Sequence, residues 1–366
     1  MNALQQVHKL GQSIWLDFID RPLMNSGHLQ QLMEEDGIRG ITSNPAIFEK
    51  AITAGTEYDQ DIQRLSQEDL SDEDLFYRLA VADIQQAADL FLPVYEDKVS
   101  GADGFVSLEV SPRLALDTDK TLEQARILWQ AVNRPNVMIK IPGTQPCLPA
   151  IRQAIAEGIN INVTLLFSLD RYAAVAEAYI AGLEDRLAAG QSIDQVSSVA
   201  SFFISRIDTL VDPILTERGL PQLKGETAIA LAKQAYALYN RLFDSERFRF
   251  LAAQGATPQR LLWASTGTKD PDFSPVKYVE ALIGPQTVDT VPMDTLTAYR
   301  ETGRPAVRLS SSDSEGLQVL DRVQQAGIDL NAIAEQLETE GIAKFNQPYD
   351  KLLEAINQQK HTLTTR

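Results

Sequence analysis

A lysine inside an apolar run is the residue of this sequence with the clearest chemical potential. Lys140 stands in Val137-Met-Ile-Lys-Ile-Pro142, where its neighbours offer an ammonium group little solvation. Because desolvation disfavours the charged form of an amine, we expect a neutral amine at this position. A neutral amine can attack a carbonyl carbon to form a Schiff base, and the protonated imine then permits cleavage of the adjacent carbon–carbon bond. This route needs no metal ion.

Such a reaction needs groups that move protons, and two carboxylates lie in other apolar runs. Glu109 stands near the end of run 105–110, and Asp17 stands in run 14–19. Glu109 could exchange protons with the carbinolamine through a water molecule held by Thr164. Asp17 could take the proton from the substrate hydroxyl as the carbon–carbon bond breaks.

Polar residues alternate with apolar ones in several of these runs. A period of two places each set on its own side of a sheet, as for Asn162 and Thr164 within run 160–166. The apolar side suits an outer layer of helices, so the polar side should face the interior of a barrel. Burying one polar group without a partner costs roughly a few kcal/mol, so a repeated pattern indicates a site. The residues assigned to the inner side are Asp17, Asn44, Glu109, Lys140, Asn162, Thr164, Ser201 and Ser265.

The apolar runs alternate with stretches of helical periodicity along most of the chain. The predicted strands are 14–19, 40–44, 104–110, 136–141, 160–166, 196–205, 261–266 and 287–291. The helical stretches singled out between them are 27–36, 72–95, 122–132, 148–156 and 169–189. A strand followed by a helix, repeated about eight times, predicts an α/β fold of the (β/α)₈ TIM-barrel type. Active sites of such barrels lie at the carboxyl ends of the strands, where the polar residues should converge.

The last part of the chain, 293–366, is expected to be helical throughout. Amphipathic patterns predict helices over 316–325, 330–337 and 342–357. We therefore expect a catalytic barrel over residues 1–310 and a helical extension over 311–366 that packs on it as part of one structural domain. The serine cluster 310–314 is the soft boundary between them.

Composition narrows the classes of protein and partner. The 366 residues carry a net charge of −17, which repels phosphate backbones and anionic lipids and argues against nucleic-acid and membrane partners. Cys147 is the single cysteine, which fits a reducing cytoplasm, and His8, His28 and His361 are too scattered for a histidine-rich metal site. The beginning of the chain does not resemble a secretion signal. We expect a cytoplasmic protein that uses neither a metal nor another cofactor.

Structural explanations exist for the same residues. A lysine in a strand is more often part of a structural ion pair than a catalyst, and Asn44 before Pro45 could simply cap a helix. Ser201 and Ser265 could be small residues that fill the taper of a barrel. Pattern alone therefore leaves a Schiff-base enzyme and a structural interpretation about equally favoured.

Five segments, in this order along the chain, carry a family resemblance. They are Gly40-Ile-Thr-Ser-Asn-Pro-Ala-Ile-Phe48, Met138-Ile-Lys-Ile-Pro-Gly-Thr144, Ile161-Asn-Val-Thr-Leu-Leu-Phe-Ser168, Ser201-Phe-Phe-Ile-Ser-Arg-Ile-Asp208 and Ala264-Ser-Thr-Gly-Thr-Lys-Asp270. Together they resemble transaldolases, and most closely the longer bacterial form with a helical C-terminal part. The resemblance covers roughly residues 11–300.

The resemblance implies a role for each matching position. Lys140 corresponds to the Schiff-base lysine, Asp17 and Glu109 to the two carboxylates, and Thr164 to the residue that holds the catalytic water. The implied substrate-binding residues are Thr42, Asn44, Asn162, Ser201, Phe203, Arg206, Ser265 and Lys269. Among them, Arg206 is expected to grip the substrate phosphate.

Two positions bear on how closely the family pattern is followed. Many members carry a second phosphate-binding arginine shortly after the Ala-Ser pair, where this chain has Lys269, a point charge without the bidentate fork. We therefore expect Ser265 and the backbone amides of Gly267 and Thr268 to share the phosphate. Relatives that release free dihydroxyacetone carry a tyrosine where this chain has Phe203, which favours transfer of the three-carbon unit over its release.

The implied reaction moves a dihydroxyacetone unit from sedoheptulose 7-phosphate or fructose 6-phosphate to an aldose phosphate. The acceptor would be glyceraldehyde 3-phosphate or erythrose 4-phosphate, in the non-oxidative pentose phosphate pathway. The alternatives are a Schiff-base aldolase that releases free dihydroxyacetone and a non-catalytic sugar-phosphate-binding barrel. A glycosidase would use Asp17 and Glu109 as paired carboxylates but leaves Lys140 without a purpose. The expected partners are small sugar phosphates, and the chain is expected to be a monomer or a homodimer.

Overall fold

The protein is a closed parallel barrel with helices around it, as the strand–helix alternation predicts. The computed structural model describes residues 2–97 and 103–364. In this part of the chain each strand pairs with the next in sequence, and β8 pairs with β1 to close the barrel. The strands are β1 (Gln12–Asp17), β2 (Gly40–Thr42), β3 (Phe105–Glu109), β4 (Val137–Pro142), β5 (Ile161–Leu166), β6 (Ser198–Phe203), β7 (Arg260–Ala264) and β8 (Thr287–Val291). The predicted (β/α)₈ fold is confirmed.

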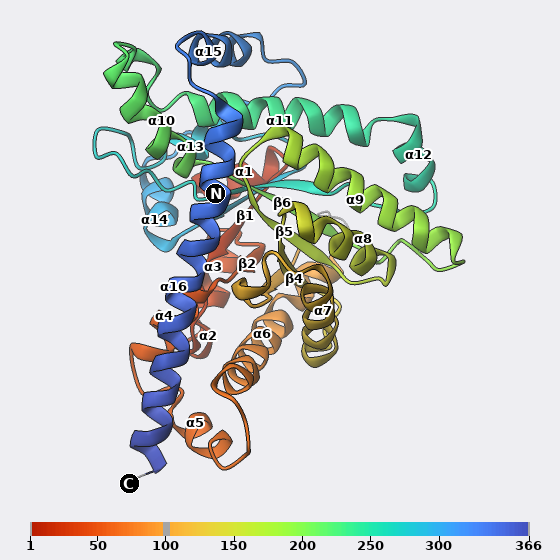
Figure 1. Cartoon of the computed structure of the whole chain (residues 1–366), viewed down its shortest axis with the longest axis vertical. Helices are drawn as coiled ribbons and strands as arrows, with labels where there is room; N and C mark the ends of the chain where they lie inside the picture. The colour runs from red at the N-terminus through yellow and green to blue at the C-terminus, as the bar shows by residue number, and fades with distance from the viewer. Residues whose placement is uncertain (1, 98–102, 365–366) are drawn as a thin grey trace.

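Helices connect the strands and form the outer layer of the barrel (Figure 1). They are α1 (Ala3–Lys9), α2 (Arg21–Asn25), α3 (His28–Glu35), α4 (Pro45–Thr53), α5 (Asp59–Leu65), α6 (Asp72–Glu96), α7 (Thr118–Val132), α8 (Leu148–Ala156), α9 (Leu169–Ala188), α10 (Ser205–Glu217), α11 (Thr227–Phe243), α12 (Glu246–Ala252), α13 (Lys277–Ala281), α14 (Met293–Thr302), α15 (Ser314–Gln325) and α16 (Leu330–Thr364). Short 3₁₀ turns η1 (Pro112–Leu114), η2 (Gln145–Cys147) and η3 (Pro221–Leu223) complete the order. Within the described residues, no helix is both long and apolar enough to cross a membrane.

Most strands begin or end one or two residues away from their predicted bounds, and β6 and β5 show further local features. Strand β6 is shorter than the predicted run 196–205, because Ser205 already begins α10. In β5 the pairing with β6 shifts register between Val163 and Leu166, and Leu165 has a positive φ of 62°. A bulge of this kind changes the direction of a strand, so it sets how β5 presents Thr164 at its carboxyl end.

The C-terminal part contains one long helix where two were predicted. Helix α16 runs without interruption through Gly341, so the expected break between 337 and 342 is wrong. Gly341 approaches β5 closely there, because an added Cβ would lie 3.0 Å from Leu165 Cδ2. Close packing therefore explains this glycine, although glycine inside a helix costs about 1 kcal/mol relative to alanine.

Helix α16 crosses the molecule from α15 at one end to α5 at the other (Figure 1). At 1.5 Å per residue its 35 residues span about 50 Å. It contacts α4, α5, α6, α10, η1 and β5, whereas α15 packs on α11. The division into a barrel over 1–310 and an extension over 311–366 stays a prediction.

The amino ends of the strands are closed by a buried ionic cluster. Asp103 accepts hydrogen bonds from Ser13 Oγ at 2.6 Å and Trp15 Nε1 at 3.0 Å. The same carboxylate pairs with Arg39 at 3.2 Å and Arg260 at 3.3 Å. Polar groups at this face of a barrel serve stability, which leaves the opposite face for chemistry.

Candidate active site

A cavity of about 260 Å³ lies at the carboxyl ends of the strands and gathers most of the predicted site residues. Those that line it are Asp17, Thr42, Asn44, Lys140, Thr164, Ser201, Phe203, Arg206, Ser265 and Lys269. The predicted residues Glu109 and Asn162 do not line it but contact residues that do. A larger cavity of about 570 Å³ lies between the start of α9 and the α15–α16 turn, but neither lysine nor arginine lines it. We therefore place the candidate site in the smaller cavity.

Lys140 extends from β4 into this cavity and is only 5% exposed. Its Nζ lies 3.4 Å from Glu109 Oε2 and donates a hydrogen bond to the Ser43 carbonyl oxygen at 3.2 Å. The neutral amine expected at Lys140 from its sequence neighbours stays a prediction.

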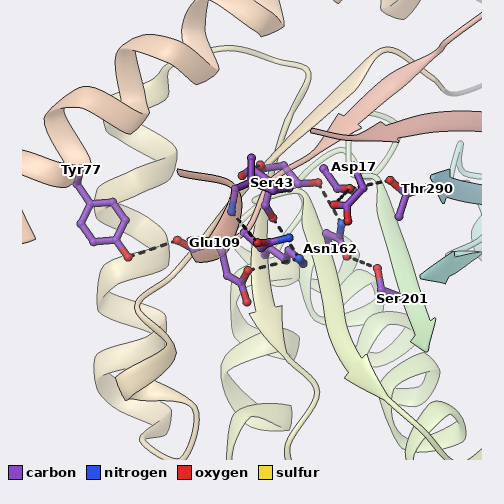
Figure 2. Close-up of polar contacts among 12 residues, drawn as sticks. Asp17, Ser43, Tyr77, Glu109, Asn162, Ser201 and Thr290 are labelled. Atoms are coloured by element: carbon purple, nitrogen blue, oxygen red, sulfur yellow. Dashed lines mark hydrogen bonds and ion pairs between the residues drawn. The ribbon is translucent and has the colours of Figure 1, made fainter. Parts of the chain in front are cut away.

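The two carboxyl groups of the site are both harder to ionise than in water. Burial raises the pKa of Glu109, and the Lys140 ammonium partly opposes this effect. Burial also raises the pKa of Asp17, although Thr42 Oγ1 donates a 2.7 Å hydrogen bond to its Oδ1. Thr42 Oγ1 lies 2.6 Å from Thr290 Oγ1 as well, so β1, β2 and β8 meet at Asp17 (Figure 2). A raised pKa suits a carboxyl group that takes up and releases a proton.

A chain of hydrogen bonds crosses three strands beneath the cavity. Ser201 Oγ donates to Asn162 Oδ1 at 2.7 Å, and Asn162 Nδ2 donates to Ser107 Oγ at 3.0 Å. Figure 2 shows Asn162 and Ser201 facing one another from neighbouring strands. Ser201 is thus more than a filler of the barrel taper, because its hydroxyl orientation is fixed by Asn162. Asn162 supports the cavity from below.

Thr164 presents an unused hydroxyl to the cavity. Its Oγ1 is buried and finds no hydrogen-bond partner among the described residues. Since buried hydroxyl groups are normally hydrogen-bonded, this atom is available to a water molecule or a substrate group. The position suits the predicted role of Thr164, which stays a prediction.

Arg206, in the first turn of α10, lies against two aromatic rings. Its Cζ is 4.9 Å from the ring centroid of Phe203 and 5.6 Å from that of Phe345. Burial lowers the pKa of Arg206, while Asp17 and Glu109 act in the opposite direction. Its buried Nη1 has no hydrogen-bond partner within residues 2–97 and 103–364. The guanidinium group is therefore held by rings and keeps a donor free for an anion.

The remaining predicted residues lie at the rim of the cavity. Ser265 has a positive φ of 58°, and its Oγ lies 2.9 Å from Ser205 Oγ, which ties the end of β7 to the start of α10. Lys269 lines the cavity from the same loop. Asn44 does cap α4, since its Oδ1 accepts a hydrogen bond from the Ile47 amide at 3.1 Å. Capping and a place in the cavity are thus compatible for Asn44.

Sequence reasoning missed Thr290, Lys344 and Phe345, which also line the cavity. Thr290 lies in the run predicted as β8, but the polar residues of that run do not alternate strictly, so its direction was not evident. Lys344 and Phe345 come from α16, and no sequence pattern connects a distant amphipathic helix with the barrel mouth.

The arrangement combines three chemical capacities. A buried amine can capture a carbonyl group, two carboxyl groups with raised pKa values can move protons, and an arginine with a free donor can bind an anion. The protein as a whole is acidic, so Arg206 and Lys269 form a local cationic region against a repulsive background.

Comparison with known proteins agrees with this geometry. The sequence model of the family described as Transaldolase/Fructose-6-phosphate aldolase matches residues 14–356. The chain is 45% identical over 358 residues to a protein named Transaldolase from Saccharopolyspora erythraea, covering 97% of both chains. It is 47% identical over 370 residues to Transaldolase 2 from a Nostoc species, again covering 97% of both. It is 45% identical over 363 residues to Transaldolase from Thermobifida fusca, covering 98% of both. The chain therefore belongs to the transaldolase/fructose-6-phosphate aldolase family of enzymes.

Proposed function

We propose that the protein is a transaldolase that works through a Schiff base at Lys140. It would move a dihydroxyacetone unit from sedoheptulose 7-phosphate or fructose 6-phosphate to glyceraldehyde 3-phosphate or erythrose 4-phosphate. We place this reaction in the non-oxidative pentose phosphate pathway of the cytoplasm. The observation that carries the proposal is the buried Lys140 amine, 3.4 Å from Glu109, in a cavity that also holds an arginine with a free donor.

The first half of the reaction forms the imine. Glu109 accepts a proton from the Lys140 ammonium, and the neutral amine attacks the ketone carbon of the donor sugar. The resulting carbinolamine then loses its hydroxyl group as water, with the proton returned by Glu109 through a water molecule held at Thr164. The raised pKa of Glu109 supports this role, because a carboxyl group that holds its proton more strongly than in water can both accept and return a proton.

The second half breaks and remakes a carbon–carbon bond. Asp17 takes the proton from the hydroxyl group beside the scissile bond, an aldose phosphate leaves, and the electron pair passes into the protonated imine to give an enamine. Attack of the enamine on the acceptor aldehyde, with return of the proton from Asp17, reverses these events. Hydrolysis of the new imine then frees Lys140. The position of Asp17 in the cavity and its raised pKa support this assignment.

The cationic region of the cavity suits sugar phosphates as substrates. We assign the phosphate to Arg206, with Lys269 and Ser265 as further contacts from the loop after β7. The substrate hydroxyl groups would meet Thr42, Asn44 and Ser201, which line the same cavity. The oligomeric state, monomer or homodimer, stays a prediction.

One observation bears on the alternative in which free dihydroxyacetone is released. Phe203 presents a ring rather than a hydroxyl group to the cavity, and that ring lies 5.3 Å from the ring of Phe167. An apolar pair at this place offers no group to orient a hydrolytic water toward the imine. We therefore favour transfer to an acceptor over release.

Borohydride trapping tests the site and the mechanism together. The protein is incubated with fructose 6-phosphate and borohydride, digested, and the adduct is mapped by mass spectrometry. We expect the three-carbon or sugar adduct on Lys140 and on no other lysine. A matched variant, Lys277→Ala, removes a lysine that pairs with Glu226 outside the cavity and should still be labelled at Lys140.

Four outcomes would contradict the proposal in different ways. Label on another lysine would refute the role of Lys140, as would transfer activity retained by a folded Lys140→Ala variant. Free dihydroxyacetone formed without an acceptor would favour the aldolase. Tight binding of sugar phosphates without turnover of any donor–acceptor pair would favour the non-catalytic barrel.

A further inference from the structure

Phe345 of α16 contacts both of the basic side chains on which the proposed chemistry depends. Its ring centroid lies 5.7 Å from Lys140 Nζ and 5.6 Å from Arg206 Cζ. The side chain is 6% exposed and lines the cavity. A single ring from the C-terminal helix thus lies against the amine on β4 and the guanidinium on α10.

The orientation of Arg206 depends on its aromatic neighbours. The ring centroid of Phe203 lies 4.9 Å from Arg206 Cζ, and that of Phe345 lies 5.6 Å from the same atom. Among the described residues no hydrogen-bond partner is found for the buried Nη1 of Arg206, although the charges of Asp17 and Glu109 raise the pKa of Arg206. The faces of aromatic rings attract cations, and guanidinium groups stack well on them. The two rings therefore define the direction in which the free Nη1 points before any anion arrives.

The position of Phe345 is fixed by contacts on both sides of it along α16. Before it, Glu338 pairs with Arg171 at 3.2 Å, and Gly341 allows the helix to approach β5. After it, Asp350 pairs with Arg113 at 2.6 Å. Tyr349, the residue before Asp350, is buried and donates a hydrogen bond to Glu73. The ring is therefore held over the cavity by a docked helix.

We propose that Phe345 is a positioning residue of the active site. Its ring aligns the Arg206 guanidinium for the anionic group of the substrate and covers the Lys140 amine from the solvent side. When the amine becomes a protonated imine, the same ring face remains beside a positive charge, so the contact persists through the reaction. The inference rests on the proposed function for the identity of the substrate, whereas the alignment of Arg206 belongs to the free protein.

Variants at this position separate the contribution of the aromatic ring from that of an apolar side chain of similar size. Phe345→Leu keeps an apolar side chain but removes the aromatic ring. Phe345→Met is a second variant of this kind, to be used if the first does not fold. Phe345→Tyr keeps the ring. We expect the Leu or Met variant to raise KM for fructose 6-phosphate roughly tenfold. KM for unphosphorylated fructose should change little, because that sugar makes no use of Arg206. The Tyr variant should recover most of the loss.

A control on the same helix tests whether docking of α16 alone explains the effect. Leu352 is fully buried on α16 and does not line the cavity, so Leu352→Ala loosens packing without removing the ring. We expect this variant to lose thermal stability while its ratio of KM values for the two sugars stays near that of the wild type. An equal change in that ratio for Leu352→Ala would overturn the role of Phe345.

A binding readout keeps this inference separate from the proposed reaction. Inorganic phosphate binding, measured by titration calorimetry, should weaken roughly tenfold in Phe345→Leu or Phe345→Met and not in Phe345→Tyr. Modification of Arg206 by phenylglyoxal, mapped by mass spectrometry, should become faster in the variants that lack the ring. If the wild-type protein transfers no three-carbon unit, the proposed function fails. Phosphate affinity and the rate of Arg206 modification would still test the positioning role of Phe345. Unchanged phosphate affinity and unchanged modification rate in the folded Leu or Met variant would refute the inference.

Discussion

Glu109 and Lys140 are register partners on adjacent parallel strands, and their Oε2 and Nζ atoms lie 3.4 Å apart. This separation exceeds the roughly 2.7–2.9 Å of a tight charge-assisted hydrogen bond. Pairing of β3 with β4 therefore holds the two groups together, and neither side chain is committed to a short bond that substrate would have to break. In the proposed mechanism this pair exchanges a proton, and the barrel does not have to rearrange for that exchange.

Replacing Glu109 by glutamine should slow the reaction without much effect on binding. Glutamine keeps the size of the side chain but cannot accept the proton of Lys140 or return one to the carbinolamine. We expect kcat to fall roughly 10²- to 10⁴-fold with KM for fructose 6-phosphate nearly unchanged, as measured by steady-state transfer kinetics. A Glu338→Gln variant, which alters the pair with Arg171 on α16, is the matched control and should retain most of its kcat. An unchanged kcat in Glu109→Gln would remove this residue from the mechanism.

Asp17→Asn should separate imine formation from bond cleavage. The amide cannot take the substrate proton, although it can still accept the hydrogen bond from Thr42. Borohydride should therefore still fix fructose 6-phosphate to Lys140, while transfer to an acceptor is lost. Mass spectrometry should find the intact six-carbon adduct, because the chain of the sugar is not cleaved. A three-carbon adduct in this variant would show that another group performs the step.

Changes at Lys269 should report on the phosphate. A guanidinium group offers a bidentate fork that an ammonium lacks, so Lys269→Arg should lower KM for phosphorylated donors, and Lys269→Ala should raise it. The expected change is several-fold in each direction, with kcat little affected. Unphosphorylated fructose is the control substrate. If both variants bind phosphorylated and unphosphorylated sugars as the wild type does, Lys269 plays no part in the site.

Asp289 on β8 should make the stability of the protein depend on pH. Burial raises the pKa of Asp289 to about 7, its Oδ1 accepts a 2.8 Å hydrogen bond from Thr266, and its Oδ2 has no partner among the described residues. Because the folded protein holds this proton to a higher pH than the unfolded chain, the free energy of unfolding falls as pH rises from about 4 to 7. Asp289→Asn should remove this loss.

The comparison is made by urea unfolding of both proteins at pH 5 and pH 8. At pH 8 the Asn variant should be more stable than the wild type by roughly 2–4 kcal/mol, and the difference should shrink at pH 5. Burial also raises the pKa of Asp208 to about 7. This residue contributes the same pH dependence to both proteins, so its effect cancels in the difference between their free energies of unfolding. A variant that is less stable than the wild type at pH 8 would show that the ionised carboxylate is compensated in the folded state.

The strands and the inner polar face could be predicted because both follow from local periodicity. Alternation of period two identifies which side of a strand Glu109 or Thr164 occupies, and parallel strands bring their carboxyl ends to one face. Lys140 could therefore be placed at the site from its strand, whereas Arg206, on α10, was assigned only through the family resemblance. The cavity gathers them as expected.

What escaped prediction depends on contacts between distant segments. Gly341 has the residue type of a helix end, and only its close approach to Leu165 explains its place inside α16. Phe345 has the appearance of a core residue in an amphipathic helix, since nothing local says that its ring faces two cations. The place of Thr290 in the cavity follows only from closure of the barrel, because closure brings β8 beside β1 and so beside Asp17.

Helix α16 also limits how the chain can be redesigned. Trimming the chain at residue 330 to obtain a minimal scaffold would take away one wall of the reaction chamber and leave Lys140 facing bulk water. Conversely, a library built on the few α16 positions that face the chamber could alter the choice of sugar while leaving every strand untouched. The proposed catalytic groups on the strands and the α16 surface beside them are thus encoded in separable parts of one polypeptide.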